Sequence, residues 1–277
     1  MTRRDLRVLI LGAGKVGRAL HHALREAGWR VTLRAARRPL PRRIDADLLV
    51  LAVRDRQLLD LLGRLPPVLG PGVACVHVAG ALRSDVLSPL RASCAGVAQM
   101  HPMISFASRT RFPTLLRGNV HVEGDRVAMQ RARALAKAIG MTPRHFPGLD
   151  TVGYHAAAAL VANGAAALAA LGARVLEASG VPATVAPKLL GPLLRSVAEN
   201  VENLGFPAAL TGPVRRGDAQ AVSRGADTLK ARAPEALPLY RAAVLAQIPL
   251  ARALGEVPGE ALDAIERWAG GAKPRRP

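Results

Sequence analysis

The stretch that decides the fold reads Arg7-Val8-Leu9-Ile10-Leu11-Gly12-Ala13-Gly14-Lys15-Val16-Gly17. An apolar strand runs directly into the pattern Gly-x-Gly-x-x-Gly, and a helix-forming segment follows at 19–24. The glycine pattern alone is a weak signal, but a strand before it and a helix after it are the context of a dinucleotide-binding turn. The first amides of such a helix, and the positive end of its dipole, face a pyrophosphate. The candidate cofactor-binding residues are therefore Gly12, Ala13, Gly14, Lys15, Val16 and Gly17.

The residue that ends the second strand indicates which dinucleotide is bound. Trp29-Arg30-Val31-Thr32-Leu33 reads as that strand, and Arg34 stands where an NAD site usually has an acid that holds the ribose 2′-hydroxyl. A guanidinium instead grips a 2′-phosphate through two parallel hydrogen bonds. Arg34 and Arg37 are thus candidate contacts to NADP(H). The alternative is that they belong to a solvated, arginine-rich loop.

The composition limits the classes of protein to which the chain can belong. The chain has 277 residues, half of them apolar, and carries a net charge of +19. The arginines are scattered, without a long basic run or interleaved aromatic residues, so a nucleic-acid partner is not favoured. The two cysteines form no disulfide framework, and no ligand spacing predicts a metal site. The N-terminus leads straight into a core strand and does not read as a signal peptide, so a cytoplasmic location is expected.

The pattern along the chain predicts an α/β domain followed by helices. Apolar segments at 48–53, 73–78 and 96–100 alternate with helical stretches, as in a doubly wound (Rossmann) parallel sheet. Shorter strands are expected at 119–122 and 144–146, around a helix at 126–139. From 149 onward only helical patterns appear. We expect an NADP(H)-binding domain at 1–148, an all-helical domain for substrate binding and dimerisation at 149–270, and a disordered tail at 271–277.

One helical segment has the length and apolarity of a membrane span. It covers Ala156–Ala173 but is mostly alanine and contains Asn163 and two glycines. A buried interface helix is the favoured interpretation, and no membrane association is expected.

Further cofactor-binding candidates (Ala52, Val53 and Gly80) and the candidate catalytic residues lie where ligands bind in such sheets, beyond the carboxyl ends of the strands. His101 follows one strand, Ala52 and Val53 end another, and Gly80 follows a third. In the first C-terminal helix, His155 and Asn163 are eight residues apart, which is about 12 Å and 80° of rotation, so both can face one cleft. His155 could donate a proton and Asn163 could bind a substrate oxygen. The alternatives are a surface histidine, an asparagine in a helix contact and, at His101, an ordinary turn.

A turn-rich loop at 210–218 offers further polar groups. Thr211 and Arg216 could bind an anionic substrate or a partner subunit. Equally, Asp218 could simply be the N-cap of the next helix.

Taken together, these motifs resemble a known family. The marks are the glycine turn, Ala52-Val53-x-Asp55, His77-Val78-Ala79-Gly80, His101-Pro102-Met103-x-x-Phe106, Tyr154-His155-Ala156-Ala157-Ala158 with Asn163, then Asn200 and Leu210-Thr211-Gly212-Pro213 up to Asp218. The chain resembles bacterial Rossmann-like NADP oxidoreductases with an all-helical C-terminal domain of unknown function. That group is similar to deazaflavin-dependent NADP oxidoreductases, and more distantly to ketopantoate reductases, pyrroline-5-carboxylate reductases and 3-hydroxyacid dehydrogenases.

The resemblance implies a nicotinamide oxidoreductase that forms a homodimer through its helical domains. It supports His101, His155, Asn163 and the 211–218 loop as cleft residues, with Tyr154, Thr211 and Arg216 as substrate contacts. Two positions depart from the pattern, because relatives often carry lysine at Thr151 and serine at Ala79. The expected activity is NADPH-dependent reduction of a small carbonyl or imine compound, with a 2-keto acid or ketopantoate-like substrate as the best guess. The alternative is a non-catalytic NADP(H)-binding redox sensor or assembly partner.

Overall fold

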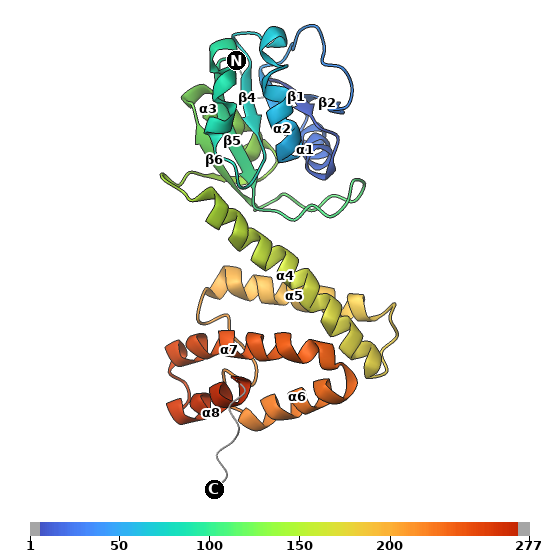
Figure 1. The fold of residues 1–277 in the computed structure, drawn as a ribbon, viewed down its shortest axis with the longest axis vertical. Coiled ribbons are helices and arrows are strands. Elements are labelled where there is room, and N and C mark those ends of the chain that lie inside the picture. The colour runs from blue at the N-terminus through green and yellow to red at the C-terminus, as the bar shows by residue number, and fades with distance from the viewer. Residues whose placement is uncertain (1–5, 271–277) are drawn as a thin grey trace. The chain divides into compact units, whose positions relative to one another are not determined.

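A computed structural model of the protein describes residues 6–270 (Figure 1). The chain forms two compact units, the first reaching to Leu160 and the second beginning at Val161. The sequence predicts the boundary at 148, whereas the first turns of the long helix α4 (Thr151–Ala178) cluster with the sheet. The predicted disordered tail, 271–277, lies outside the described residues.

The first unit is built on a seven-stranded sheet in the order β2-β1-β3-β4-β5-β6-β7. Its strands are β1 (Arg7–Leu11), β2 (Arg30–Arg34), β3 (Leu48–Leu51), β4 (Ala74–His77), β5 (Gly96–Pro102), β6 (Asn119–Gly124) and β7 (Thr142–Arg144). Strands β1 to β5 pair in parallel, as predicted.

One strand departs from the predicted parallel sheet. β6 pairs antiparallel with β5, and β7 then pairs in parallel with β6. The cause is the connection 103–118, which contains no helix. A parallel return needs a crossover connection, usually a helix, whereas a simple loop brings the chain back antiparallel. The predicted strand at 144–146 lies two residues earlier, at 142–144.

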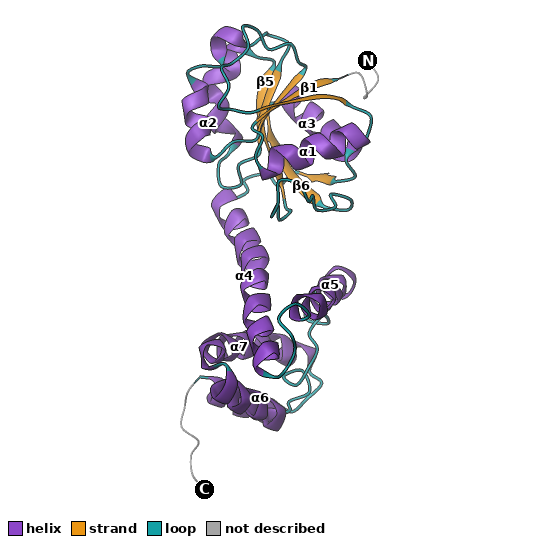
Figure 2. Cartoon of the chain, turned by 90° about the vertical axis from the view of Figure 1, so that its right-hand side faces the viewer, coloured by secondary structure: helices purple, strands orange, loops and turns teal. Residues whose placement is uncertain are grey.

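Helices cover both faces of this sheet, which confirms the doubly wound prediction (Figure 2). On one face, α1 (Lys15–Glu26) and α3 (Arg126–Ala138) pack onto a core that includes Ile10, Val50 and Val122. On the other face lie α2 (Asp55–Leu62) and the 3₁₀ helix η2 (Ser84–Ser93), which share a core with Leu49 and Cys75. Strands β3 and β4 are buried throughout, as central parallel strands should be.

The second unit is helical, as predicted. After α4 come α5 (Ala186–Leu204), α6 (Ala219–Arg232), the short 3₁₀ helix η3 (Pro234–Ala236), α7 (Leu237–Leu254) and α8 (Gly259–Ala269). Its core is formed by α6, α7 and α8 through residues such as Val222, Ile248 and Ile265. Asp218 caps α6 by accepting a hydrogen bond from Ala221 N–H at 2.8 Å.

Helices α4 and α5 contribute little to either core. Thr151 is the one buried residue of α4, and Ala186 the one buried residue of α5. α4 is long and apolar enough to cross a membrane by length and composition, and none of that window is buried within the chain.

Candidate active site

The glycine turn has the close backbone contacts that a dinucleotide-binding loop requires. Gly12 has φ of +122°, and a Cβ there would lie 2.2 Å from the carbonyl oxygen of Ala52. A Cβ at Gly17 would lie 1.9 Å from the carbonyl oxygen of Gly12. Both positions therefore demand glycine, the first for the turn and the other for close packing of helix on strand.

Gly14 differs from the other two glycines because open space surrounds it. A Cβ at Gly14 would meet no atom within 4 Å, and its φ of −77° suits any residue. Packing within the chain therefore does not explain a glycine here, but close approach of a pyrophosphate does. Gly14 is also the N-cap of α1, so the unpaired amides of the first helical turn point into this space. The residues present thus fit a dinucleotide.

The turn is tied to the strands on both sides. Gly12 N–H donates to the carbonyl of Arg34 at 2.8 Å, and Ala52 N–H donates to Leu11 O at 2.9 Å. The Arg18 guanidinium braces the turn by donating to Ala13 O at 3.1 Å. The backbone of Ala52, directly after β3, is thus hydrogen-bonded to the residue that precedes the turn. Lys15, in the first turn of α1, is exposed.

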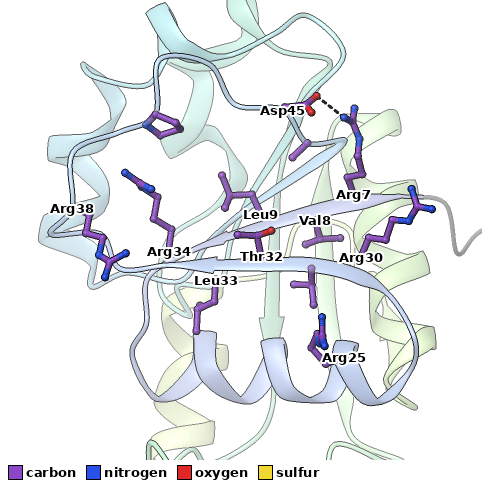
Figure 3. A pocket seen from close by; sticks show the side chains of 13 residues that line it. Arg7, Val8, Leu9, Arg25, Arg30, Thr32, Leu33, Arg34, Arg38 and Asp45 are labelled. Carbon is purple, nitrogen blue, oxygen red and sulfur yellow. Dashed lines mark hydrogen bonds and ion pairs between the residues drawn. The ribbon is translucent and has the colours of Figure 1, made fainter.

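Beside the turn, a basic pocket of about 700 Å³ runs along the edge strand β2 (Figure 3). The connection from β2 to β3 contains no helix, so this edge stays open. Arg34 and Arg38 line the pocket at the end near Gly12, whereas Arg37 is exposed outside it. The Arg34 guanidinium donates to Pro39 O, with Nε at 3.2 Å.

A second cluster lies at the carboxyl ends of β4 and β5. A Cβ at Gly80 would lie 2.3 Å from Nδ1 of His155 and 2.8 Å from Cε1 of His101. The His101 and His155 rings meet edge to face, with centroids 5.6 Å apart, and Tyr154 lies 6.0 Å from His101. The structure therefore brings four predicted site residues together, at the sheet edge that also carries the glycine turn.

The beginning of α4 is fastened to this edge by hydrogen bonds with Ala81 and Arg83. Thr151 Oγ1 donates to Ala81 O at 3.2 Å, and the Arg83 guanidinium donates to Leu149 O at 3.1 Å. Arg83 also pairs with the buried carboxylate of Glu123 at 3.4 Å. Thr151 thus holds the beginning of the helix in place.

Burial determines the protonation of His101, one of the two histidines of this cluster. Burial lowers the pKa of His101, so its ring is neutral near pH 7. His101 Nδ1 lies 3.2 Å from Val78 O, and a carbonyl can only accept, so Nδ1 carries the proton. Nε2 of the neutral ring is then an acceptor, and the single N–H of the His101 ring is held by Val78 O. His155, the other histidine of the cluster, is exposed.

Three predicted residues belong to the other unit. Asn163, Thr211 and Arg216 are all exposed there. In the 211–218 loop, Arg215 is the structural arginine, since it donates to the carbonyls of Ala208 and Leu210 and pairs with Glu256. Among residues 6–270 no group of three potential metal ligands occurs.

Sequence reasoning missed one buried polar residue of the site, Gln99. It is 1% exposed and donates from Nε2 to Ala79 O at 2.8 Å and to Gly80 O at 3.3 Å. The available signal was a glutamine inside the apolar strand 96–100, where an unpaired amide would be costly.

Comparison with known proteins supports the same fold. Residues 119–247, from β6 into α7, match a family described as a domain of unknown function, DUF2520. No curated protein matches the chain.

Solved structures match over nearly the whole length. A protein of Bacteroides fragilis, named as a candidate NADP oxidoreductase, is 20% identical with a TM-score of 0.70, over 89% of this chain and 99% of that one. A Thermotoga maritima protein is 23% identical with a TM-score of 0.66, over 90% and 100%. Pyrroline carboxylate reductase of Plasmodium falciparum, solved with NADP bound, is 14% identical with a TM-score of 0.61, over 91% and 99%.

These identities are low, so the likeness establishes the fold. The resemblance to Rossmann-like NADP oxidoreductases with a helical C-terminal part is thereby confirmed as a likeness of architecture.

Proposed function

We propose that the protein is an NADPH-dependent oxidoreductase that reduces a small carbonyl or imine compound, with a 2-keto acid or ketopantoate-like molecule as the best candidate. The observation that carries the proposal is the glycine turn, in which Gly12 and Gly17 are fixed by packing while Gly14 faces open space. The cluster of Gly80, His101 and His155 at the same sheet edge supports a reaction centre there.

In this function, the glycine turn and the arginines would bind the cofactor, and the two histidines would act on the substrate. The amides of the turn and of the first turn of α1 bind the pyrophosphate. Arg34 and Arg38 bind the 2′-phosphate. For this, the Arg34 guanidinium must release its hydrogen bond to Pro39 O and donate to the phosphate instead. When bound, NADPH supplies the hydride at the edge near Val53 and Gly80. His155 gives a proton to the acceptor. Nε2 of His101 can accept a hydrogen bond from the N–H of an imino substrate.

The alternative is a protein that binds NADP(H) without turnover. It is favoured by Thr151, whose hydroxyl is occupied by Ala81 O and cannot replace a lysine amine as a proton relay. One experiment separates the two functions: calorimetry with NADP⁺ and NADPH, followed by NADPH oxidation against 2-keto acids, ketones and cyclic imines. Binding with turnover supports the reductase, binding without turnover supports the alternative, and no binding at millimolar nucleotide contradicts both.

We further propose that the protein is a homodimer that buries α4 and α5 between two copies. Ten of the fifteen large apolar side chains that are exposed among the described residues lie on these two helices. They are Val152, Leu160, Val161, Leu168, Leu189, Leu193, Leu194, Val197, Val201 and Leu204. An apolar surface of this extent on a water-soluble protein marks an interaction site.

A further inference from the structure

The loop after β4, residues 78–83, is held by side chains at almost every carbonyl. Val78 O is 3.2 Å from Nδ1 of His101, and Arg83 O is 3.1 Å from Nε2 of His77. Thr151 donates to Ala81 O. Gln99 donates to the carbonyls of Ala79 and Gly80, which lie between Val78 and Ala81 in the chain. These contacts fix the orientation of successive peptide units in the loop.

That orientation determines where the amides point. In a trans peptide unit the N–H bond points opposite to the C=O bond. The carbonyls of Ala79 and Gly80 both point at one atom, Nε2 of Gln99. The amides that share those peptide units, Gly80 N–H and Ala81 N–H, therefore both point away from Gln99, to the same side of the loop.

These two amides are free to bind a ligand. Within residues 6–270 no group accepts a hydrogen bond from Gly80 N–H or Ala81 N–H. Gly80 is nevertheless buried, and an unpaired amide in a buried residue is rare without a ligand or a water molecule. The two amides also adjoin His155 and His101, whose rings lie against Gly80.

We infer that Gly80 N–H and Ala81 N–H bind a carboxylate of the substrate, which makes the substrate an oxo or imino acid. Two unpaired amides on one side of a loop can receive the oxygens of a carboxylate, as in other anion-binding loops. The buried carboxylate of Glu123 is already paired, because it forms a salt bridge with Arg83 and accepts a hydrogen bond from the Ser84 amide. Gln99 acts as a positioning residue that keeps both amides aimed at the ligand. The inference rests on the proposed function, because it concerns the substrate of that site.

The test compares acids with matched uncharged amides. Wild-type protein is saturated with NADP⁺, and calorimetry measures the binding of pyruvate and phenylpyruvate and of the two corresponding amides. We expect at least one acid to bind tenfold or more tightly than its amide, since hydrogen bonds to a charged acceptor are about twice as strong as neutral ones. Equal binding of acid and amide, or no binding of any acid at 10 mM, overturns the inference.

A size-matched variant then tests Gln99. Gln99→Met fills the same volume without a donor, so the peptide units can turn and the preference for the acid should fall below threefold. The control is Gln247→Met on α7, the same substitution, which removes a single hydrogen bond to a backbone carbonyl, that of Ala243. Unchanged affinity for adenosine 2′,5′-bisphosphate shows that the variant is folded.

Two further outcomes identify what has failed. If Gln99→Met keeps the acid preference, the positioning role is wrong. If it instead weakens NADP⁺ relative to adenosine 2′,5′-bisphosphate, the amides serve the cofactor's carboxamide and the inference is overturned. Wild-type protein that binds neither nucleotide contradicts the proposed function itself.

Discussion

At the scale of single residues, Arg34 tests the choice of nucleotide. Arg34→Ala removes the guanidinium at the end of β2, and the NADPH dissociation constant should rise about tenfold to a hundredfold, the range for hydrogen bonds to a charged group. The NADH constant should change less than twofold, because NADH has no 2′-phosphate. Calorimetry with both nucleotides measures the difference, and Arg37→Ala, outside the pocket, is the matched control. An equal loss for both nucleotides would show that Arg34 supports only the loop.

His155 tests the assignment of the proton donor. His155→Ala should reduce kcat about a hundredfold to ten-thousandfold, the usual contribution of a general acid. NADPH affinity should stay within threefold, because the ring contacts Gly80 and lies outside the glycine turn. His22→Ala serves as the control, since that ring packs on Phe112. Unchanged turnover would exclude His155 as the donor, and transfer of the role to Tyr154 would be the next hypothesis.

At the scale of elements, a substitution of Gly14 should distinguish an effect on stability from an effect on nucleotide binding. Gly14→Ala fits the backbone and meets no atom within 4 Å, so stability should change by less than about 1 kcal/mol, the effect of altering an N-cap. The added methyl group lies where the pyrophosphate approaches, and NADPH affinity should fall at least tenfold. The control is Gly63→Ala at the end of α2, which is equally open. Thermal unfolding measures the stability of the variants, and calorimetry measures their NADPH affinity. Normal NADPH affinity of Gly14→Ala would mean that the nucleotide does not approach this turn.

The elements show how far the sequence alone could lead. Strand β1, the glycine turn and α1 were predictable because local periodicity and turn chemistry agree there. The antiparallel β6 was missed because its direction depends on a helix being absent from 103–118, which periodicity does not reveal. Gln99 was missed because its partners, the carbonyls of Ala79 and Gly80, are twenty and nineteen residues away in the chain. Contacts of that kind arise from strand register and are invisible in local patterns.

At the scale of the whole molecule, buried histidines should make the sheet unit acid-sensitive. Burial lowers the pKa of His77 to about 4, and His101 and His121 are lowered for the same reason. A histidine with a lowered pKa in the fold binds protons more readily when unfolded, so stability is retained above pH 6.5 and falls as the pH drops toward 4. For His77 alone the loss is about 3 kcal/mol at pH 4.

Urea unfolding at pH 7.5, 5.5 and 4 measures this effect. In a Trp268→Phe background, fluorescence reports on the buried Trp29 of the sheet unit. His77→Gln should flatten the pH dependence of the unfolding free energy, because glutamine does not titrate. If the unfolding free energy falls equally with pH in the wild type and in His77→Gln, then His77 does not cause the acid sensitivity.

Six of the fifteen exposed large apolar side chains of the described residues lie on α5. Among them Leu189, Leu193, Val197 and Val201 repeat every four residues and so lie on one face. If a second copy covers this face and α4, light scattering should give twice the chain mass of 29.1 kDa. Leu193→Glu should shift the protein toward the monomer, because a buried carboxylate would have no partner. Leu59→Glu on α2 is a close control, since both leucines are 57% exposed in the single chain. A wild-type monomer at micromolar concentration, or recovery only with detergent, would contradict the dimer, and the second result would assign α4 to a membrane.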